Sequence, residues 1–277
     1  MMIVIDVDKC TGCGLCLNVC HNRCVALVGG MARINRELCD RCTQCIAICP
    51  QQALSWDQVP PASYHEALLP SAEQLDELFK ERRSIRFFKE DRIDRKLLQE
   101  IVGYGAYAPT NNHELRVVVV DDAAVMQELE RIVVRFNSRM YRLFFRSKIV
   151  FELFRRISPA VNPTVRVKLE KRRQDFFSPA AMVLIVGDKR IAFSEASAQA
   201  ALDHITLYAL VKGIGSCLWG AGRIVLDRNQ VARERLGLQR HEHILGVLLM
   251  GVPAVRFRNK AEGKTMPVQW NRAQDRS

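Results

Sequence analysis

The stretches CTGCGLCLNVC (residues 10–20) and CDRCTQCIAICP (residues 39–50) decide the fold of the first part of this chain. Each stretch holds four cysteines in the spacing C-x2-C-x2-C-x3-C, and the second ends with Pro50. Nine of the ten cysteines of the chain lie within its first 49 residues. Because the spacing is regular and repeated, it indicates metal ligands and not a disulfide framework.

This repeated spacing resembles that of the bacterial ferredoxins that bind two 4Fe-4S clusters, in which three cysteines of one run and the last cysteine of the other hold each cluster. The resemblance covers residues 1–58 and predicts a ferredoxin-like two-cluster domain there. It implies two crossed ligand sets: Cys10, Cys13, Cys16 and Cys49 for one cluster, and Cys20, Cys39, Cys42 and Cys45 for the other. A pair of zinc sites is the alternative, but zinc would leave the third cysteine of each run without a role. Cys24 lies outside the pattern, and we expect it to pack as a small apolar residue.

A second domain follows a stretch with three prolines, VPPASYHEALLP at residues 59–70. The prolines predict an extended linker over residues 59–74 and a second domain over residues 75–277. From residue 71 onward, helical and strand periods alternate, which predicts a mixed α+β domain. We expect helices at residues 71–82, 94–108 and 194–212, and strands at residues 115–120, 182–187 and 244–250.

Three short stretches of the second domain indicate a ligand site. RRSIRFF (residues 82–88) places three guanidiniums and a hydroxyl close together, which suits a phosphate, although alone it is equally typical of a solvated basic turn. APTNNHE (residues 108–114) is an amide-rich loop between a helix and a strand. GIGSCLWGAG (residues 213–222) has glycines that let backbone N–H groups approach a ligand closely.

In this order and spacing, the three stretches resemble those of the nitroreductase family of flavin enzymes, from about residue 76 to the C-terminal PVQW. The resemblance implies a nitroreductase-type α/β/α domain that binds FMN as a homodimer. It implies flavin contacts from the basic motif, from the amide-rich loop of the other subunit, from a glycine N–H beside flavin N5 and from a C-terminal lysine. These residues are Arg82, Arg83, Ser84 and Arg86; Pro109, Thr110 and Asn112, with Asn111 as the alternative to Asn112; Gly220; and Lys264, with Lys260 as the alternative. In that family Cys217 would be a buried packing residue.

The formal net charge of +11 is unevenly distributed. Residues 1–58 carry five basic and five acidic side chains, whereas residues 131–173 carry thirteen Lys or Arg and two Glu. The second range reads as a basic, amphipathic segment. It is open to two interpretations: a lid or dimer helix with a solvated face, or a docking surface for an acidic redox partner or an anionic membrane. No recognised nucleic-acid module accompanies the charge, so we expect no nucleic-acid partner.

Together the two domains predict an iron–sulfur flavoprotein oxidoreductase. Electrons would pass from two 4Fe-4S clusters to FMN and on to an electron-poor small molecule of nitroaromatic, quinone or enone type. The sequence leaves open whether NAD(P)H donates directly, and it assigns no catalytic side chain. The alternatives are a non-catalytic electron relay or redox sensor, and a reductive dehalogenation or biosynthetic redox enzyme on the same scaffold. Because the longest apolar runs are too short to span a bilayer and the N-terminus has no signal-peptide pattern, we expect a cytoplasmic protein.

Overall fold

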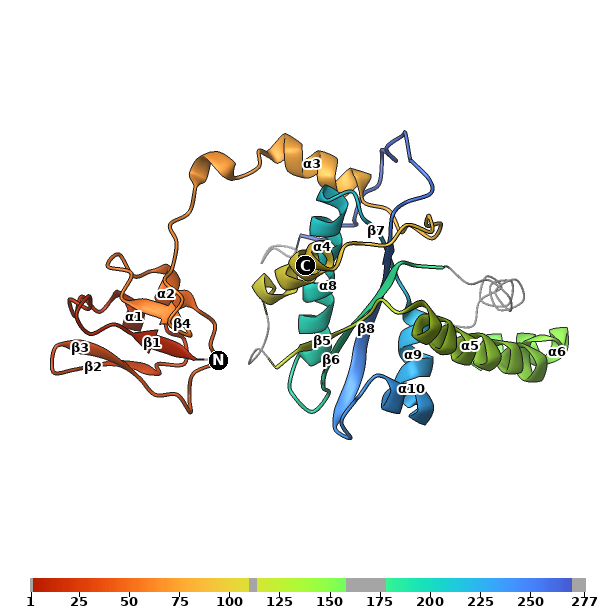
Figure 1. Cartoon of the computed structure of the whole chain (residues 1–277), viewed down its shortest axis with the longest axis horizontal. Helices are drawn as coiled ribbons and strands as arrows, with labels where there is room; N and C mark the ends of the chain where they lie inside the picture. The colour runs from red at the N-terminus through yellow and green to blue at the C-terminus, as the bar shows by residue number, and fades with distance from the viewer. Residues whose placement is uncertain (1, 110–113, 158–177, 271–277) are drawn as a thin grey trace, which may run out of the picture.

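The structure, a computed structural model, describes residues 2–109, 114–157 and 178–270 of the chain. In Figure 1 a small N-terminal unit stands apart from a larger one, and the chain arches between them through the 3-10 turn η1 (Glu66–Leu68) and helix α3 (Ala72–Glu81). The Ser71 hydroxyl accepts from the Gln74 N–H, and the Gln74 side chain accepts from the Ser71 N–H, so a capping box begins α3. The helix predicted from residue 71 is confirmed, while the domain boundaries at residues 58 and 74 stay predictions.

The N-terminal unit consists of two antiparallel strand pairs and two one-turn helices. Strand β1 pairs with β4, and β2 pairs with β3. Each helix begins directly before the third cysteine of a run, so Cys16 and Cys45 point into the small apolar core. The elements are β1 (Ile3–Ile5), α1 (Leu15–Asn18), β2 (Val25–Val28), β3 (Met31–Ile34), α2 (Gln44–Ala47) and β4 (Leu54–Trp56).

A four-stranded antiparallel sheet in the order β5-β6-β8-β7 forms the centre of the larger unit. The two middle strands are buried along nearly their whole length, which explains why their sequences are almost continuous apolar runs. The register shifts between Ile185 and Val186, where Leu245 of β8 has no partner in β6. The strands are β5 (Arg116–Val120), β6 (Ala181–Asp188), β7 (Gly215–Leu218) and β8 (Glu242–Gly251).

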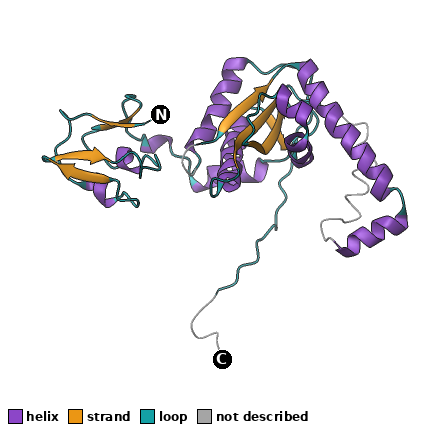
Figure 2. Ribbon diagram, turned by 90° about the horizontal axis from the view of Figure 1, so that it is seen from below, coloured by secondary structure: helices purple, strands orange, loops and turns teal. Residues whose placement is uncertain are grey.

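Helices cover both faces of this sheet, as Figure 2 shows. One apolar core lies between the sheet and α4 and α8, and the other lies between the sheet and α5, α9 and α10. This three-layer arrangement is the α/β/α architecture predicted for the domain. The helices are α4 (Arg95–Gly103) with the 3-10 turn η2 (Tyr104–Tyr107), α5 (Ala123–Met140), α8 (Ser194–Val211), α9 (Gly220–Arg228) and α10 (Gln230–Arg235).

Most predicted elements of the larger unit are confirmed within two residues at each end, but one prediction was wrong. The helix expected to run to residue 108 ends at Gly103 and continues as the tighter turn η2. The glycine-rich stretch 213–222, for which the sequence predicted no helix or strand, contains strand β7 and the start of α9. Strand β7 has only four residues, GSCL, and forms because β8 offers it a pairing edge and not because of its own strand propensity.

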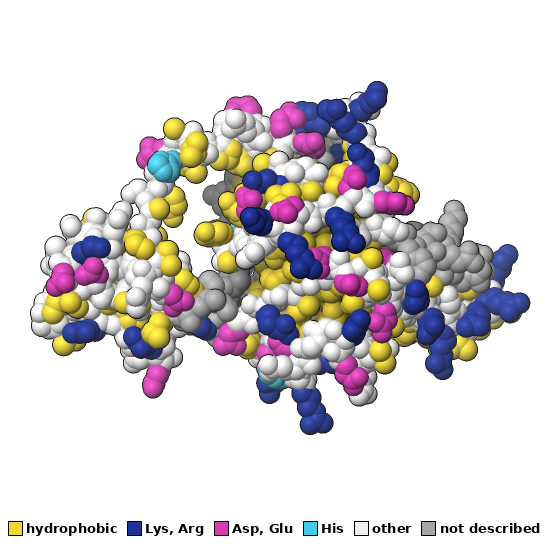
Figure 3. Space-filling model, in the orientation of Figure 1, with side chains coloured by type: hydrophobic (Ala, Val, Ile, Leu, Met, Phe, Trp, Pro, Cys, Tyr) yellow, Lys and Arg dark blue, Asp and Glu magenta, His cyan; other side chains and the backbone are white. Residues whose placement is uncertain are grey.

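The basic segment begins on a helical arm that projects from the larger unit (Figures 1 and 2). Helix α5 packs on the sheet through Met126, Leu129 and Val133, and continues through a π-helical turn, η3 (Tyr141–Phe145), into α6 (Lys148–Ile157). Figure 3 shows Lys and Arg side chains gathered at the outer end of this arm. Residues 158–173 of the segment lie outside the described residues. None of the described helices is both long and apolar enough to span a bilayer.

Candidate functional site

The cysteines of the N-terminal unit surround two small cavities of about 20 Å³ each. The first is lined by Cys10, Cys13, Cys16 and Cys49, and the second by Cys20, Cys39, Cys42 and Cys45. The structure thus brings together the two crossed sets that the sequence predicts, and their role as cluster ligands stays a prediction. Among the described residues, no three or more His, Cys, Asp or Glu are arranged to hold a single metal ion.

The two cysteine loops share an unusual backbone shape. Gly12 and Gly14 of the first loop have φ angles of +69° and +77°, and Arg41 and Thr43 at the matching positions of the second have +58° and +63°. A Cβ atom at Gly12 would lie 2.0 Å from the carbonyl oxygen of Gly30, so only glycine fits there. Position 41 holds an arginine in the same left-handed conformation, which glycine adopts more easily.

The chemistry of the cysteine sets fits iron–sulfur clusters. The Ala32 N–H donates to Cys10 Sγ at 3.5 Å, and the Ala53 N–H donates to Cys49 Sγ at 3.4 Å. Hydrogen bonds of this kind to cysteine sulfurs help to set cluster potentials. Burial, together with neighbouring thiols, raises the pKa of Cys45 to about 12. The Cys45 thiol therefore needs a positively charged metal beside it to become a thiolate at neutral pH.

Cys24 is buried, as predicted, but it also lines the second cavity. Its Sγ lies 3.3 Å from Cys20 Sγ. Burial and this contact raise the pKa of Cys24 to about 12, so the group is a protonated thiol beside a predicted ligand. The sequence pattern missed this position because Cys24 falls outside the repeated spacing.

A larger cavity of about 500 Å³ lies in the second unit, where the end of α3 meets α8 and β7. The Ile85 N–H donates to the Ser216 carbonyl oxygen at 2.9 Å, and the Lys89 N–H donates to that of Val252 at 2.8 Å. These bonds lay the RRSIRFF stretch along β7, with a parallel bridge between Ser84 and Ser216. Two motifs far apart in the sequence thereby form one wall of a cavity with the volume of a small-ligand site.

Close approach of the two motifs depends on Gly215. A Cβ atom at this position would lie 2.9 Å from three atoms of the Ile85 side chain. Any larger residue would therefore push the basic stretch away from β7.

The charged residues that line this cavity are four basic side chains and one acidic side chain, Glu81. Arg82, Lys89 and Arg256 line it, and within the described part of the chain none of the three is paired with an acidic group. Arg83 also lines the cavity, and its guanidinium donates to the carbonyl oxygens of Lys80 and Arg82 at the end of α3. This excess of unpaired positive charge suits a phosphate or another anion.

The remaining predicted residues of the basic motif, Ser84 and Arg86, are not among the lining residues of the cavity. Ser84 bridges to Ser216 through its backbone, and Arg86 Nη1 donates to the Ser84 carbonyl oxygen at 3.4 Å. Gly220 begins α9 and is not among the lining residues. Pro109 follows η2 and does not line the cavity either. Thr110, Asn111 and Asn112 lie outside the described residues.

The C-terminal segment places a different cation in the cavity from the predicted one. Lys264 is exposed and is not a lining residue, and Lys260 pairs with Glu77 of α3. Arg256, from the start of the same segment, lines the cavity instead. Sequence reasoning missed both Arg256 and Lys89. Lys89 directly follows the basic stretch 82–88, which is the signal that could have found it, whereas Arg256 lies five residues after β8 and has no such signal.

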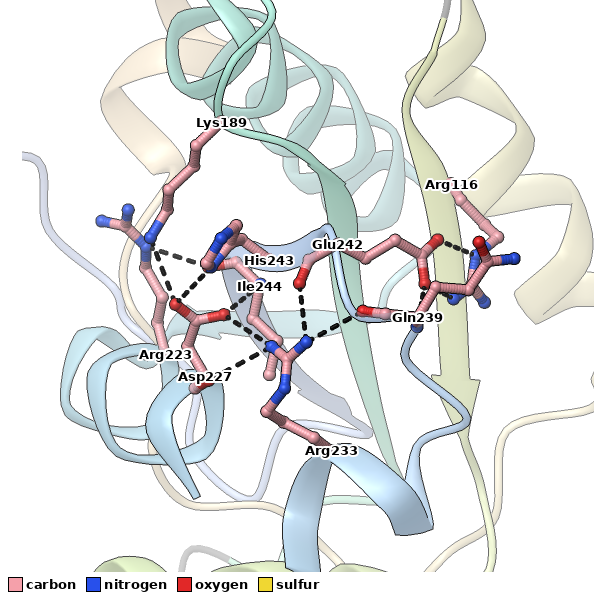
Figure 4. A network of polar contacts seen from close by, with 9 residues as sticks. All are labelled: Arg116, Lys189, Arg223, Asp227, Arg233, Gln239, Glu242, His243 and Ile244. Carbon is pink, nitrogen blue, oxygen red and sulfur yellow. Dashed lines mark hydrogen bonds and ion pairs between the residues drawn. The ribbon is translucent and has the colours of Figure 1, made fainter. Parts of the chain in front are cut away.

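A polar network anchors α9, the helix that begins at Gly220 (Figure 4). Asp227 is 10% exposed, and its carboxylate accepts from the Ile244 N–H at 2.7 Å and from Lys189 Nζ at 3.1 Å. His243 Nδ1 lies 3.1 Å from the same carboxylate, and Arg233 Nη1 lies 3.6 Å from it. Burial raises the pKa of Asp227, but the hydrogen bonds from Ile244, His243 and Lys189 outweigh burial, so the pKa lies below its ordinary value.

Two family models match separate parts of the chain. The model of the nitroreductase family matches residues 79–252, and that of the 4Fe-4S dicluster domain matches residues 2–57. A ferredoxin of Pyrobaculum islandicum is 37% identical over 54 residues, which make up 19% of this chain and 50% of the ferredoxin. The chain thus spans about half the length of that relative.

Solved structures resemble the larger unit. A nitroreductase of Bacteroides fragilis with bound FMN has a TM-score of 0.53 and 18% sequence identity. The match covers 71% of this chain and 99% of the nitroreductase chain. A nitroreductase of Desulfitobacterium hafniense with bound FMN has a TM-score of 0.54 and 19% sequence identity. That match covers 70% of this chain and 97% of the nitroreductase chain. At this level of identity the likeness shows the fold.

Proposed function

The chain belongs to the nitroreductase family, and from that premise we propose that it is an FMN-dependent oxidoreductase that receives its electrons from its own N-terminal 4Fe-4S dicluster domain. Two clusters would supply electrons to FMN, and an electron-poor small molecule of nitroaromatic, quinone or enone type would accept them. The observation that carries the proposal is the cavity between the basic motif and β7, with its unpaired cations.

The residues around this cavity would bind FMN through its phosphate and its polar ring atoms. Arg82, Lys89 and Arg256 supply positive charge without acidic partners among the described residues, and the backbone at Ser216 and Gly215 forms a wall without bulky side chains. Both structural neighbours described above hold FMN, which supports the same ligand here. A bound FMN accepts electrons one at a time and passes them on in pairs, which is the chemistry that connects clusters with a two-electron acceptor.

The acceptor site would be shared between two copies of the chain. No described residue of the stretch 108–114 lines the cavity of its own chain. This supports a homodimer in which Pro109, Thr110 and Asn112 of one subunit contact the flavin bound by the other, with Gly220 and Lys264 completing the contacts. The basic segment, residues 131–173, is then either a lid over the acceptor or the docking surface for an acidic redox partner or an anionic membrane.

The proposal is tested by anaerobic purification followed by iron, sulfide and flavin analysis. About eight irons and one FMN per chain are expected. Zinc in place of iron would contradict the cluster assignment, and protein without flavin would contradict the FMN assignment.

A second experiment separates an enzyme from an electron relay. Steady-state assays without oxygen would supply electrons from reduced ferredoxin or from NAD(P)H and offer nitroaromatics, quinones and enones. An enzyme turns over one of these small molecules, whereas a relay reduces another protein and none of them. The same screen identifies the electron donor.

A further inference from the structure

An ion pair joins the two units of the chain. Arg41 Nη2 lies 3.9 Å from Glu114 Oε1, and the two side chains are 31% and 49% exposed. Arg41 lies between Cys39 and Cys42 in the second cysteine loop, and Glu114 ends the stretch 108–114 that the sequence predicts to reach the flavin. The contact therefore brings the second cysteine loop to Glu114, two residues after Asn112, which the sequence predicts to reach the flavin.

The backbone of Arg41 has a conformation that is unfavourable for a non-glycine residue, which it shares with seven other described non-glycine residues. Its φ of +58° lies in the left-handed region that favours glycine, and the first loop has Gly12 at the matching position. A non-glycine residue kept in such a conformation often marks a functional position. In this structure the Arg41 side chain meets a carboxylate of the other unit.

We infer that the Arg41–Glu114 pair docks the second cysteine loop at Glu114, just before β5, so that electrons leave the dicluster domain from the set Cys20, Cys39, Cys42 and Cys45. This inference rests on the proposed function. In the step concerned, the reduced cluster loses one electron and the flavin gains it. An external low-potential one-electron donor re-reduces the clusters, and the small-molecule acceptor removes two electrons and two protons from the reduced flavin.

A weak contact is sufficient for this role because the two units are tethered. The linker over residues 59–70 keeps the partners at a millimolar effective concentration, so a single exposed ion pair can shift the docked fraction. Transient redox contacts between proteins are typically small. Since both charges are partly exposed, salt is expected to weaken the docking.

The test uses the full chain loaded with iron and flavin. Flash photoreduction delivers a single electron, and the intramolecular phase of flavin reduction is followed at low and high salt. Arg41→Gly and Glu114→Gln are each expected to slow this phase about 1.4- to 5-fold at low salt. The double variant Arg41→Glu with Glu114→Arg is expected to restore it. Arg33→Glu, which changes the charge of the same unit at an exposed position of β3, is the matched control and should transfer at the wild-type rate.

Small-angle scattering of the same proteins gives a readout independent of electron transfer. The radius of gyration should rise in Arg41→Gly and Glu114→Gln, and return to the wild-type value in the charge-reversed pair. Wild-type rates and dimensions in both single variants would overturn the inference, as would a charge-reversed pair that stays slow. Wild-type protein whose flavin stays oxidised while its clusters are reduced would instead overturn the proposed function.

Discussion

Replacement of Asp227 by alanine is expected to destabilise the larger unit strongly. The carboxylate lies where α9, α10, β8 and the end of β6 meet, and it accepts the buried Ile244 N–H at 2.7 Å (Figure 4). Alanine leaves that donor without an acceptor and removes the countercharge of Lys189 and Arg233. Arg233 keeps its backbone acceptors at Gln239 and Glu242, which limits the loss.

The magnitude follows from the groups left without partners. An unsatisfied buried donor costs about 1–3 kcal/mol, and removing one member of a buried ion pair costs about 3–5 kcal/mol. Because Lys189 is 37% exposed and Arg233 keeps other partners, we expect a total of about 2–4 kcal/mol for Asp227→Ala. For a domain of this size that corresponds to a fall in Tm of about 4–16 °C.

Thermal unfolding of the loaded full-length protein, followed by calorimetry and by flavin release, measures the change. Asp203→Ala, which removes an exposed carboxylate of α8, is the control and should change stability by less than about 0.5 kcal/mol. The pKa of Asp227 is lower in the folded than in the unfolded protein, so its ionised carboxylate stabilises the fold at pH values above the ordinary aspartate pKa. This stabilisation is lost as the pH falls through the lowered folded-state pKa. The difference between wild type and Asp227→Asn should therefore be constant near neutral pH and shrink below about pH 4. A loss of stability for Asp227→Ala no larger than that of the control would refute the reasoning.

Three further predictions concern the two cofactor sites. Arg256→Ala should weaken FMN binding about 10-fold in a fluorescence titration of the apoprotein, whereas Lys264→Ala tests the contact predicted from the sequence; a larger effect of Lys264→Ala would reverse their assigned roles. Cys45→Ser should lower the iron content from about eight to about four per chain and leave the flavin content unchanged, and full iron content would contradict the assignment of Cys45 as a cluster ligand. Gly215→Ala should reduce flavin retention, because the new Cβ would lie 2.9 Å from the Ile85 side chain. Ile85→Ala in the same chain should partly restore flavin retention. Unchanged flavin retention in Gly215→Ala would show that Ile85 can move aside without disturbing the cavity.

Sequence reasoning predicted the elements whose signal lies within their own residues. The buried strands β6 and β8 read as apolar runs, and the Ser71 cap marked the start of α3. Strand β7 was missed because its pairing with β8 depends on a partner about thirty residues away, and GSCL has little strand propensity of its own. Arg256 was missed for a similar reason, since the path of the chain after β8 decides which cation of the C-terminal segment lines the cavity.

The predicted flavin contacts come from the residues that line the cavity and from the stretch 108–114, which does not line the cavity of its own chain through any described residue. If stretch 108–114 of one chain serves the cavity of the other, the Arg41–Glu114 contact sets the clusters of each chain beside the flavin of its partner. Mixed dimers test this arrangement. The first chain carries Cys45→Ser, so it binds flavin but lacks the cluster held by Cys45. The second chain carries Arg82→Ala with Arg256→Ala, so it holds both clusters but binds no flavin. Cluster-driven reduction of that flavin is expected in the mixed dimer and in neither parent dimer. A flavin that stays oxidised in the mixed dimer would show that each chain reduces the flavin in its own cavity.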